Sequence, residues 1–357
     1  MRKTQMALAA VALVASAGVM AQESGVKISG RFDIGYMSGS GSADLDGTSG
    51  AVTSTPAAPT AGALTYTRAA NTVVGKALNT GLLAPNFLNV SGSEDLGNGM
   101  KASFMVSSII NSAGFNSGTI GTAQSWVGVS GDFGGIKLGQ TVDSFAGTYL
   151  SFDVTAGSNI GSAVSALFSH GASGVFHDRS IQITAPSFSG VNVAATYIVQ
   201  DGTTAAVASK AGDYSIAGSA DIGSIKVGAG YSQAGALNNT SSFLGAGTDL
   251  GFAKVNVIHL SSSDVGTAGL KASTSGVNAE IPVAGALSAR VGYYNTSGTN
   301  TTINGTTTVV TGLYALSPRT TAFANWEQAS DKVQLGRGNG GYGTAGSIAT
   351  LGVAHSF

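Results

Sequence analysis

The sequence predicts an all-β fold, a closed antiparallel barrel of sixteen transmembrane strands, on three observations. Short segments alternate apolar with polar or small residues, as strands do when their two faces meet different surroundings. The connections between these segments alternate between tight turns and long polar loops. Gly accounts for 53 of 357 residues and charged residues for only 10%, a composition that suits turns and strands better than helices. The sequence contains no Cys, so the expected fold uses no disulfides.

The connections give the number of strands. Seven short ones are interpreted as tight turns, at residues 94–99, 131–135, 186–190, 221–224, 249–252, 281–285 and 316–320. Eight longer polar segments alternate with them, at residues 38–84, 111–121, 141–177, 201–212, 234–242, 262–269, 295–306 and 331–345. Fifteen connections join sixteen strands, an even number with the short turns on one side and the long loops on the other. That is the layout of a single-chain bacterial barrel.

The first predicted strand shows how the two faces differ. Its apolar face comprises Val26, Ile28, Phe32, Ile34 and Tyr36, and its polar face comprises Lys27, Ser29, Arg31 and Asp33. We assign the apolar face to lipid and the polar face to the lumen. A soluble antiparallel sheet with one wet face would alternate in the same way. The barrel is favoured because no continuous apolar run marks a second, fully buried layer, and because closure removes the sheet edges.

The N-terminal segment predicts secretion. Arg2 and Lys3 precede an apolar stretch at residues 6–19, and Ala21 offers a small residue at a cleavage site. The stretch is shorter than the roughly 20 residues that a membrane helix needs. We therefore expect residues 1–21 to be a cleaved signal peptide and residues 22–357 to form the barrel domain. Without the signal the chain has 15 basic and 18 acidic residues, and no basic excess predicts nucleic acid as a partner.

Two patterns that resemble cofactor or metal sites are weak. Gly338, Gly340 and Gly343 match the spacing of a dinucleotide-binding loop, but no helical pattern follows them. His170, His177 and Asp178 lie near one another in sequence, but no further ligand follows at metal spacing. Hydrolase motifs are absent from the sequence. We therefore expect neither an enzyme nor a bound cofactor or metal.

Several segments resemble one known family. Residues 91–102, SGSEDLGNGMKA, are similar to a turn of the general porins of Gram-negative outer membranes, in the form common in betaproteobacteria. Similar segments follow in family order at 123–139, 179–190 and 314–320, and the alternating C-terminal strand ends on an aromatic residue, as family members do.

The resemblance carries expectations about structure and function. It implies a sixteen-stranded homotrimer in the outer-membrane lipid, with the third long loop folded inward to narrow the pore. It implies passive diffusion of small hydrophilic solutes and ions. It also implies that Phe357 is an assembly signal, recognised by the barrel assembly machinery.

The chain also departs from the family pattern. Asn86, Phe87 and Gln140 stand where family members usually place a Ser-Arg pair and an Arg on the pore wall. Weak anion preference is therefore expected. The first long loop, at 38–84, is longer than expected and is interpreted either as a surface flap or as a segment with an unusual strand pairing.

The predicted function is a passive, water-filled channel whose selectivity comes from charges at its narrowest part. The residues predicted to line the pore or its constriction are Lys27, Arg31, Asp33, Lys101, Lys137, Asp143, Asp153, Arg179 and Arg290. Two alternatives stay open. One is a solute-specific channel of the same fold, and the other, from a different class, is a secreted β-rich adhesin.

Overall fold

The computed structural model describes most of the wall and parts of the loops. The described residues are 25–40, 76–111, 114–115, 120–155, 163, 166–167, 170, 175–199, 212–234, 239–264, 269, 271–299, 304–330 and 346–357. The predicted signal peptide, the glycine pattern at 338–343 and much of the first and last long loops lie outside them.

The described residues form eighteen strands and helix α1, which spans Ser144–Leu150. The first nine strands are β1 Gly25–Ser40, β2 Lys76–Thr80, β3 Phe87–Gly97, β4 Met100–Asn111, β5 Gly114–Phe115, β6 Gln124–Gly131, β7 Gly134–Val142, β8 Phe176–Thr184 and β9 Val191–Ile198. The others are β10 Tyr214–Ile222, β11 Ile225–Ala234, β12 Asn239–Asp249, β13 Lys254–Ser263, β14 Lys271–Ala284, β15 Leu287–Gly298, β16 Gly305–Ser317, β17 Thr320–Ala329 and β18 Gly346–Ser356.

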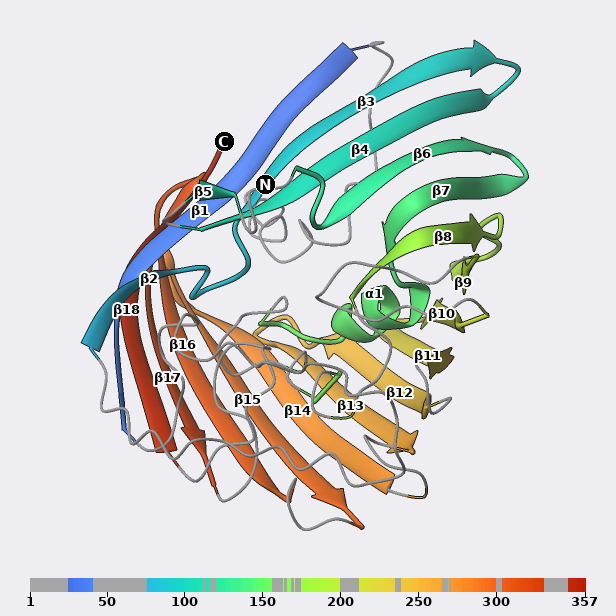
Figure 1. Cartoon of the computed structure of the whole chain (residues 1–357). Helices are drawn as coiled ribbons and strands as arrows, with labels where there is room; N and C mark the ends of the chain where they lie inside the picture. The colour runs from blue at the N-terminus through green and yellow to red at the C-terminus, as the bar shows by residue number, and fades with distance from the viewer. Residues whose placement is uncertain are drawn as a thin grey trace, which may run out of the picture.

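These strands make a closed antiparallel barrel with sixteen wall positions (Figure 1). β1 closes the ring because it pairs with β18 on one side and with β2 and β3 on the other. β2 and β3 share one wall position, and the two-residue β5 pairs with the end of β4. The predicted sixteen-stranded barrel is therefore confirmed, and each predicted tight turn separates two consecutive wall strands.

The first long loop contains the unusual strand pairing that the sequence left open. β3 pairs with residues 25–31 of β1, and β2 pairs with residues 34–38 of the same strand. Residues 81–86, hereafter the inner segment, therefore stand opposite only Phe32 and Asp33. A continuous strand would place two residues there, so the inner segment leaves the plane of the wall.

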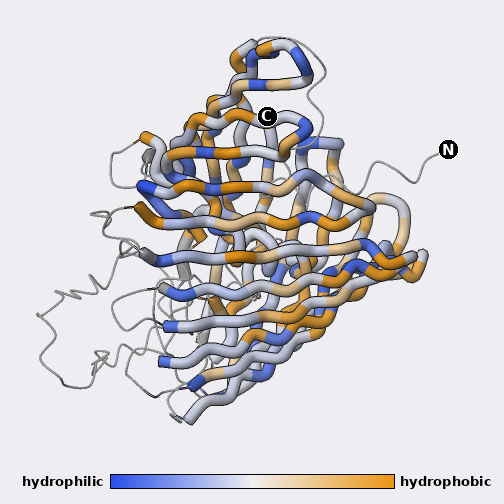
Figure 2. The backbone as a smooth tube through the Cα atoms, turned by 90° about the vertical axis from the view of Figure 1, so that its right-hand side faces the viewer, coloured by the Kyte–Doolittle hydropathy of each residue, from blue (hydrophilic) through white to orange (hydrophobic). Residues whose placement is uncertain are grey.

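Hydrophobic and hydrophilic residues alternate along the strands (Figure 2). The outer face of the wall carries exposed apolar residues and is bounded by aromatic ones. Exposed aromatic residues near the short-turn ends are Phe133, Phe188, Phe252, Tyr314 and Phe357. Exposed aromatic residues toward the long-loop ends are Tyr36, Tyr197, Tyr214, Tyr231, Tyr293 and Trp326. Two such girdles around an apolar band are typical of barrels that span a bilayer. Among the described residues, no helix is both long and apolar enough to cross a membrane.

The buried apolar residues lie inside the barrel, on its inner wall. One cluster joins α1 and the residues after it to the inner faces of β10, β12, β13, β15 and β16, with Phe145, Tyr149 and Phe152 at its centre. Gly228 of β11 lets the Phe152 ring touch the wall, because a Cβ at this position would meet the ring. A second cluster joins the inner segment to the inner faces of β16, β17 and β18.

The C-terminal residue adds two hydrogen bonds to the seam between the first and last strands. The Phe357 amide donates to the Gly30 carbonyl at 3.0 Å, and the Gly30 amide donates to the Phe357 carbonyl at 2.9 Å. A Cβ on Gly30 would lie 2.5 Å from Cζ of Phe357 and 2.6 Å from the carbonyl oxygen of Phe87. Only glycine therefore fits beside the terminal ring.

Candidate pore constriction

Among the described residues, the shortest ion pair joins β14 to β15. Glu280 and Arg290 are directly opposite in the antiparallel register. The Nε of Arg290 donates to Oε2 of Glu280 at 2.7 Å, and Arg290 is only 6% exposed. Both side chains point inward, because Val291 and Ala279 take the lipid face of the same strands. The pair thus places one positive and one negative group side by side on the lumen wall.

Other charges gather around this pair. Arg31 of β1 interacts electrostatically with both Asp33 and Arg290. Asp153, in the third long loop, also interacts electrostatically with Arg290. Residues that are far apart in the sequence therefore share one electrostatic neighbourhood inside the barrel, and this neighbourhood is our candidate constriction.

Asp143 anchors the start of the third long loop. It is the N-cap of α1, and its Oδ1 accepts the Ala146 amide at 2.9 Å. Its Oδ2 accepts the Ser215 hydroxyl of β10 at 2.6 Å and lies 3.7 Å from Nε2 of His177. N-cap carboxylates satisfy amides that the first helical turn leaves without partners. The carboxylate is thus buried and engaged by the loop and the wall together.

Asp153 holds the middle of the same loop. Its Oδ1 accepts the amide and the hydroxyl of Thr155 at 2.9 and 2.6 Å, and its Oδ2 accepts the Ala163 amide at 3.0 Å. The Tyr294 hydroxyl of β15 donates to Oδ1 at 3.4 Å. Burial is the main effect on the Asp153 carboxyl and raises its pKa, while these hydrogen bonds act in the opposite direction.

Polar side chains of the wall hold the loop at three further points. Asn278 of β14 donates to the Phe152 carbonyl and accepts the Val154 amide, both at 3.0 Å. Lys226 of β11 donates to the Ser151 hydroxyl at 3.0 Å and lies over the Phe152 ring. The loop therefore contacts the inner wall through both hydrogen bonds and apolar packing.

His170 joins the later part of the loop to the wall. Its Nδ1 lies 3.2 Å from the Ser262 hydroxyl and its Nε2 lies 2.9 Å from the Thr274 hydroxyl. Its carbonyl accepts the Asn239 side chain at 3.0 Å. Burial, with a smaller contribution from His259, lowers the pKa of His170 to about 4. The ring is therefore neutral at neutral pH, as a buried ring between two hydroxyls requires.

The sequence-predicted pore residues fall into three groups. Arg31, Asp153 and Arg290 lie together at the candidate constriction. Asp33 and Asp143 are buried, and their carboxylates accept hydrogen bonds from backbone amides and a hydroxyl. The others lie elsewhere along the wall. The Nζ of Lys137 is 4.5 Å from the centroid of the Trp126 ring. Lys27 and Lys101 are exposed near short-turn ends, and Arg179 of β8 has a backbone φ of 51°. For all nine residues, a pore-lining role stays a prediction.

Sequence reasoning missed Glu280 and did not select Lys226 or Tyr294. Glu280 could have been found by counting outward from the predicted turn at 281–285, because residues about equally distant from a hairpin turn face each other. Alternation along their strands correctly placed Lys226 and Tyr294 on the inner face. Alternation alone does not predict that a side chain will contact a loop from elsewhere in the chain.

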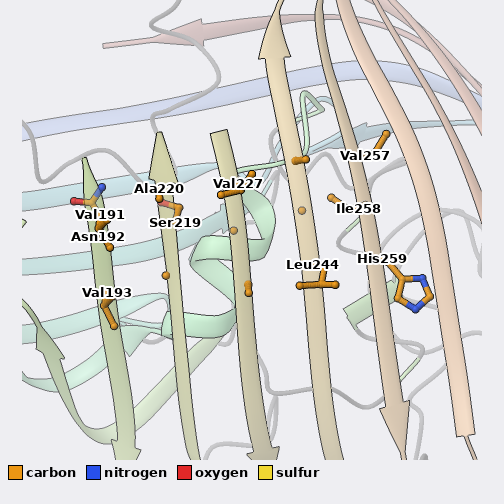
Figure 3. Close-up of a pocket in the computed structure, with 15 residues that line it drawn as sticks. Val191, Asn192, Val193, Ser219, Ala220, Val227, Leu244, Val257, Ile258 and His259 are labelled. Carbon is orange, nitrogen blue, oxygen red and sulfur yellow. The ribbon is translucent and has the colours of Figure 1, made fainter. Parts of the chain in front are cut away.

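Two other features of the described residues are separate from this site. A shallow apolar hollow crosses β9 to β13 and is lined by residues such as Val193, Leu244 and Val257 (Figure 3). These side chains are on the lipid-facing side of the wall, while Phe152 packs behind Gly228 and Gly245. The hollow is therefore not part of the lumen. No cluster of His, Cys, Asp and Glu among the described residues is suited to hold a metal ion.

Comparisons with known proteins agree with this architecture. A family model for Gram-negative porins matches residues 7–334. The major outer membrane protein P.IA of Neisseria meningitidis serogroup C is 27% identical over 116 residues, which cover 32% of this chain. The matched stretch spans only 28% of the length of that relative.

Solved structures match over nearly the whole chain. The anion-selective porin from Comamonas acidovorans aligns with a TM-score of 0.73 and 21% identity, covering 94% of this chain and 100% of that one. The trimer form of OmpT from Vibrio cholerae aligns with a TM-score of 0.61 and 13% identity, over 94% and 100% of the two chains. At these identities the likeness shows the fold. Because the family model covers residues 7–334 and the wall is a closed porin-like barrel, the chain belongs to the Gram-negative porin family of outer-membrane proteins.

Proposed function

We propose that this protein is a passive, water-filled channel for small hydrophilic solutes and ions. One observation carries the proposal: Arg31, Glu280 and Arg290 gather on the inner wall of a barrel whose outer wall is apolar. Charged groups at a narrow aqueous passage bias which ions pass, while neutral solutes are selected by width. Catalysis and a bound cofactor form no part of this proposal.

Swelling of liposomes that contain the purified protein tests the proposal. With neutral sugars of increasing size, a general diffusion channel gives swelling rates that fall smoothly with solute size. A solute-specific channel of the same fold would admit one sugar out of size order. The absence of swelling with any sugar would contradict both.

A secreted adhesin is the alternative from another class. The apolar outer face between two aromatic girdles favours residence in a bilayer over release. Fractionation distinguishes them, because a channel stays with the outer-membrane fraction and an adhesin appears in the medium. We also propose that residues 1–21 are removed during export, and intact mass of the membrane protein should then correspond to residues 22–357.

We propose a homotrimer as the working assembly. The trimer form of OmpT, a structural neighbour, supports this assembly by analogy of fold. Unheated protein in mild detergent should migrate on a gel as a compact oligomer and shift to the monomer position after boiling. Migration as a monomer before boiling, with the barrel still folded, would contradict the trimer.

Deleting Phe357 is expected to reduce folded barrel in cells much more than it reduces refolding of purified chain in detergent. The β1–β18 seam keeps its ten register pairs without Phe357, so closure in detergent retains most of its hydrogen bonds. In cells, the assembly machinery would also lack the aromatic terminus that it is expected to recognise. Heat-modifiable band intensity measures both yields. If the yield of folded barrel falls equally in cells and in detergent, the deletion acts by weakening the β1–β18 seam. It would then not act through recognition by the assembly machinery.

A further inference from the structure

The inner segment, residues 81–86, projects from the wall into the lumen. Six residues stand where the neighbouring strand provides only Phe32 and Asp33. Leu82, Leu83 and Ala84 are all buried. Leu82 and Leu83 pack with residues that face inward, so the extra length bulges to the lumen side and not toward lipid.

Asp33 fixes the backbone of this segment. Its Oδ1 accepts the Leu82 amide at 2.7 Å, and its Oδ2 accepts the Leu83 and Ala84 amides at 3.2 Å each. The Asn86 side chain completes the arrangement, accepting the Asp33 amide at 2.8 Å and donating to the Asp33 carbonyl at 3.1 Å. Three successive backbone amides thus donate to one carboxylate, and such charge-assisted hydrogen bonds fix the path of the segment.

Apolar contacts hold the same segment against the inner wall. Leu82 and Leu83 pack in one cluster with Met37, Leu313, Phe323 and Ile348, from four different strands. Leu82 also lies close over Gly35, where an added Cβ would be 3.0 Å from its Cδ1. The segment therefore covers the inner faces of β1 and β16 to β18, a part of the wall that the contacts of α1 do not include.

The residue that follows the segment links it to the third long loop. The Phe87 ring meets the Phe176 ring edge to face, with centroids 6.3 Å apart. Phe176 begins β8 and packs against the cluster that contains α1. β3 and β8 are separated in the wall by β4, β6 and β7. The contact thus connects the two inward structures across the inner side of several strands.

We propose that the inner segment is a second constriction element, which acts with the third long loop to set the largest solute that passes. Asp33 is its positioning residue, and it acts through the backbone of residues 82–84 and not as a charge exposed to the solute. This inference rests on the proposed channel function. It explains why a carboxylate at a lumen-facing position of the first strand is completely buried.

Shortening the segment tests the proposal. Deleting residues 81–84 leaves two residues opposite Phe32 and Asp33, as a continuous strand would have. Liposome swelling with neutral sugars then reports width, since loss or exposure of a charge does not act on uncharged solutes. We expect the rate for a trisaccharide, relative to a pentose, to rise about threefold or more, because pore diameter governs this ratio. Asp33→Ala should produce a smaller rise of the same sign.

Asp95→Ala is the matched control, because Asp95 also accepts a backbone amide, from Gly97 at 2.8 Å, but in an exposed turn. It should leave the sugar ratio unchanged. If the deletion chain does not fold, Leu82→Ala with Leu83→Ala trims the segment and keeps Asp33, and it should raise the ratio as well. An unchanged ratio in the folded deletion chain, or in this double variant, overturns the inference. Absence of swelling by the wild-type protein would instead contradict the channel function itself.

Discussion

Replacing Arg290 with alanine is expected to shift the channel strongly toward cations. The substitution leaves the Glu280 carboxylate on the inner wall without the guanidinium that lies 2.7 Å away. A unit charge about 6 Å from a permeating ion contributes about 0.7 kcal/mol in water, roughly threefold for each ion and about tenfold for the cation-to-anion ratio. Reversal potentials across a salt gradient measure this ratio. The shift should fade as salt rises, because screening acts over about 8 to 10 Å at moderate salt.

The partner substitutions separate charge from structural damage. Glu280→Ala should shift the ratio toward anions, and the double variant should return near wild type. Arg31→Ala should shift it toward cations, while Arg319→Ala, in the exposed turn between β16 and β17, should have little effect. Shifts of the same sign in both single variants of the Glu280 and Arg290 pair would show that a structural change, and not the charge, controls selectivity.

Replacing Asp143 with alanine is expected to loosen the third long loop. The Ala146 amide, the Ser215 hydroxyl and His177 lose the carboxylate they share. An N-cap contributes about 1 kcal/mol and a hydrogen bond to a charged group about 1.5 to 3 kcal/mol, so anchoring should weaken by roughly 3 kcal/mol. Greater current noise and faster proteolysis within the loop are the expected results.

Asp143→Asn is the matched variant, because asparagine also caps helices well but carries no charge. The anchoring role predicts that it behaves nearly as wild type in noise and proteolysis. If alanine leaves the loop intact while asparagine shifts the reversal potential toward anions, Asp143 acts as a pore charge, as the sequence predicted.

The strands of the wall could be predicted from the sequence because the signals that determine them are local. Period-two alternation and turn residues recur along the chain, and each strand repeats the same signal. The two faces of β1 were assigned correctly for the same reason: Ile34 and Tyr36 are exposed on the outside, and Asp33 is buried inside. Family resemblance supplied the expectation of loop residues inside the lumen, which alternation alone does not predict.

The interior was harder to predict because its contacts join distant residues. Asp33 and Arg31 look alike in the pattern, as polar residues on one face of one strand. The difference between them depends on amides some 50 residues further along the chain, from Leu82 to Ala84. Asp153 likewise appears as a loop acid, although its carboxylate is surrounded by Thr155, Ala163 and Tyr294. Side-chain parity shows which way a group points, and it does not show which backbone amides will meet it.

Conductance of the purified wild-type protein in planar bilayers tests the central claim most directly. A water-filled diffusion channel should insert in discrete steps and pass an ohmic current that rises with salt concentration without saturating. Failure to conduct in protein shown to be folded would contradict the account. So would a current that saturates at low salt, because that result would indicate tight solute-specific binding in the lumen.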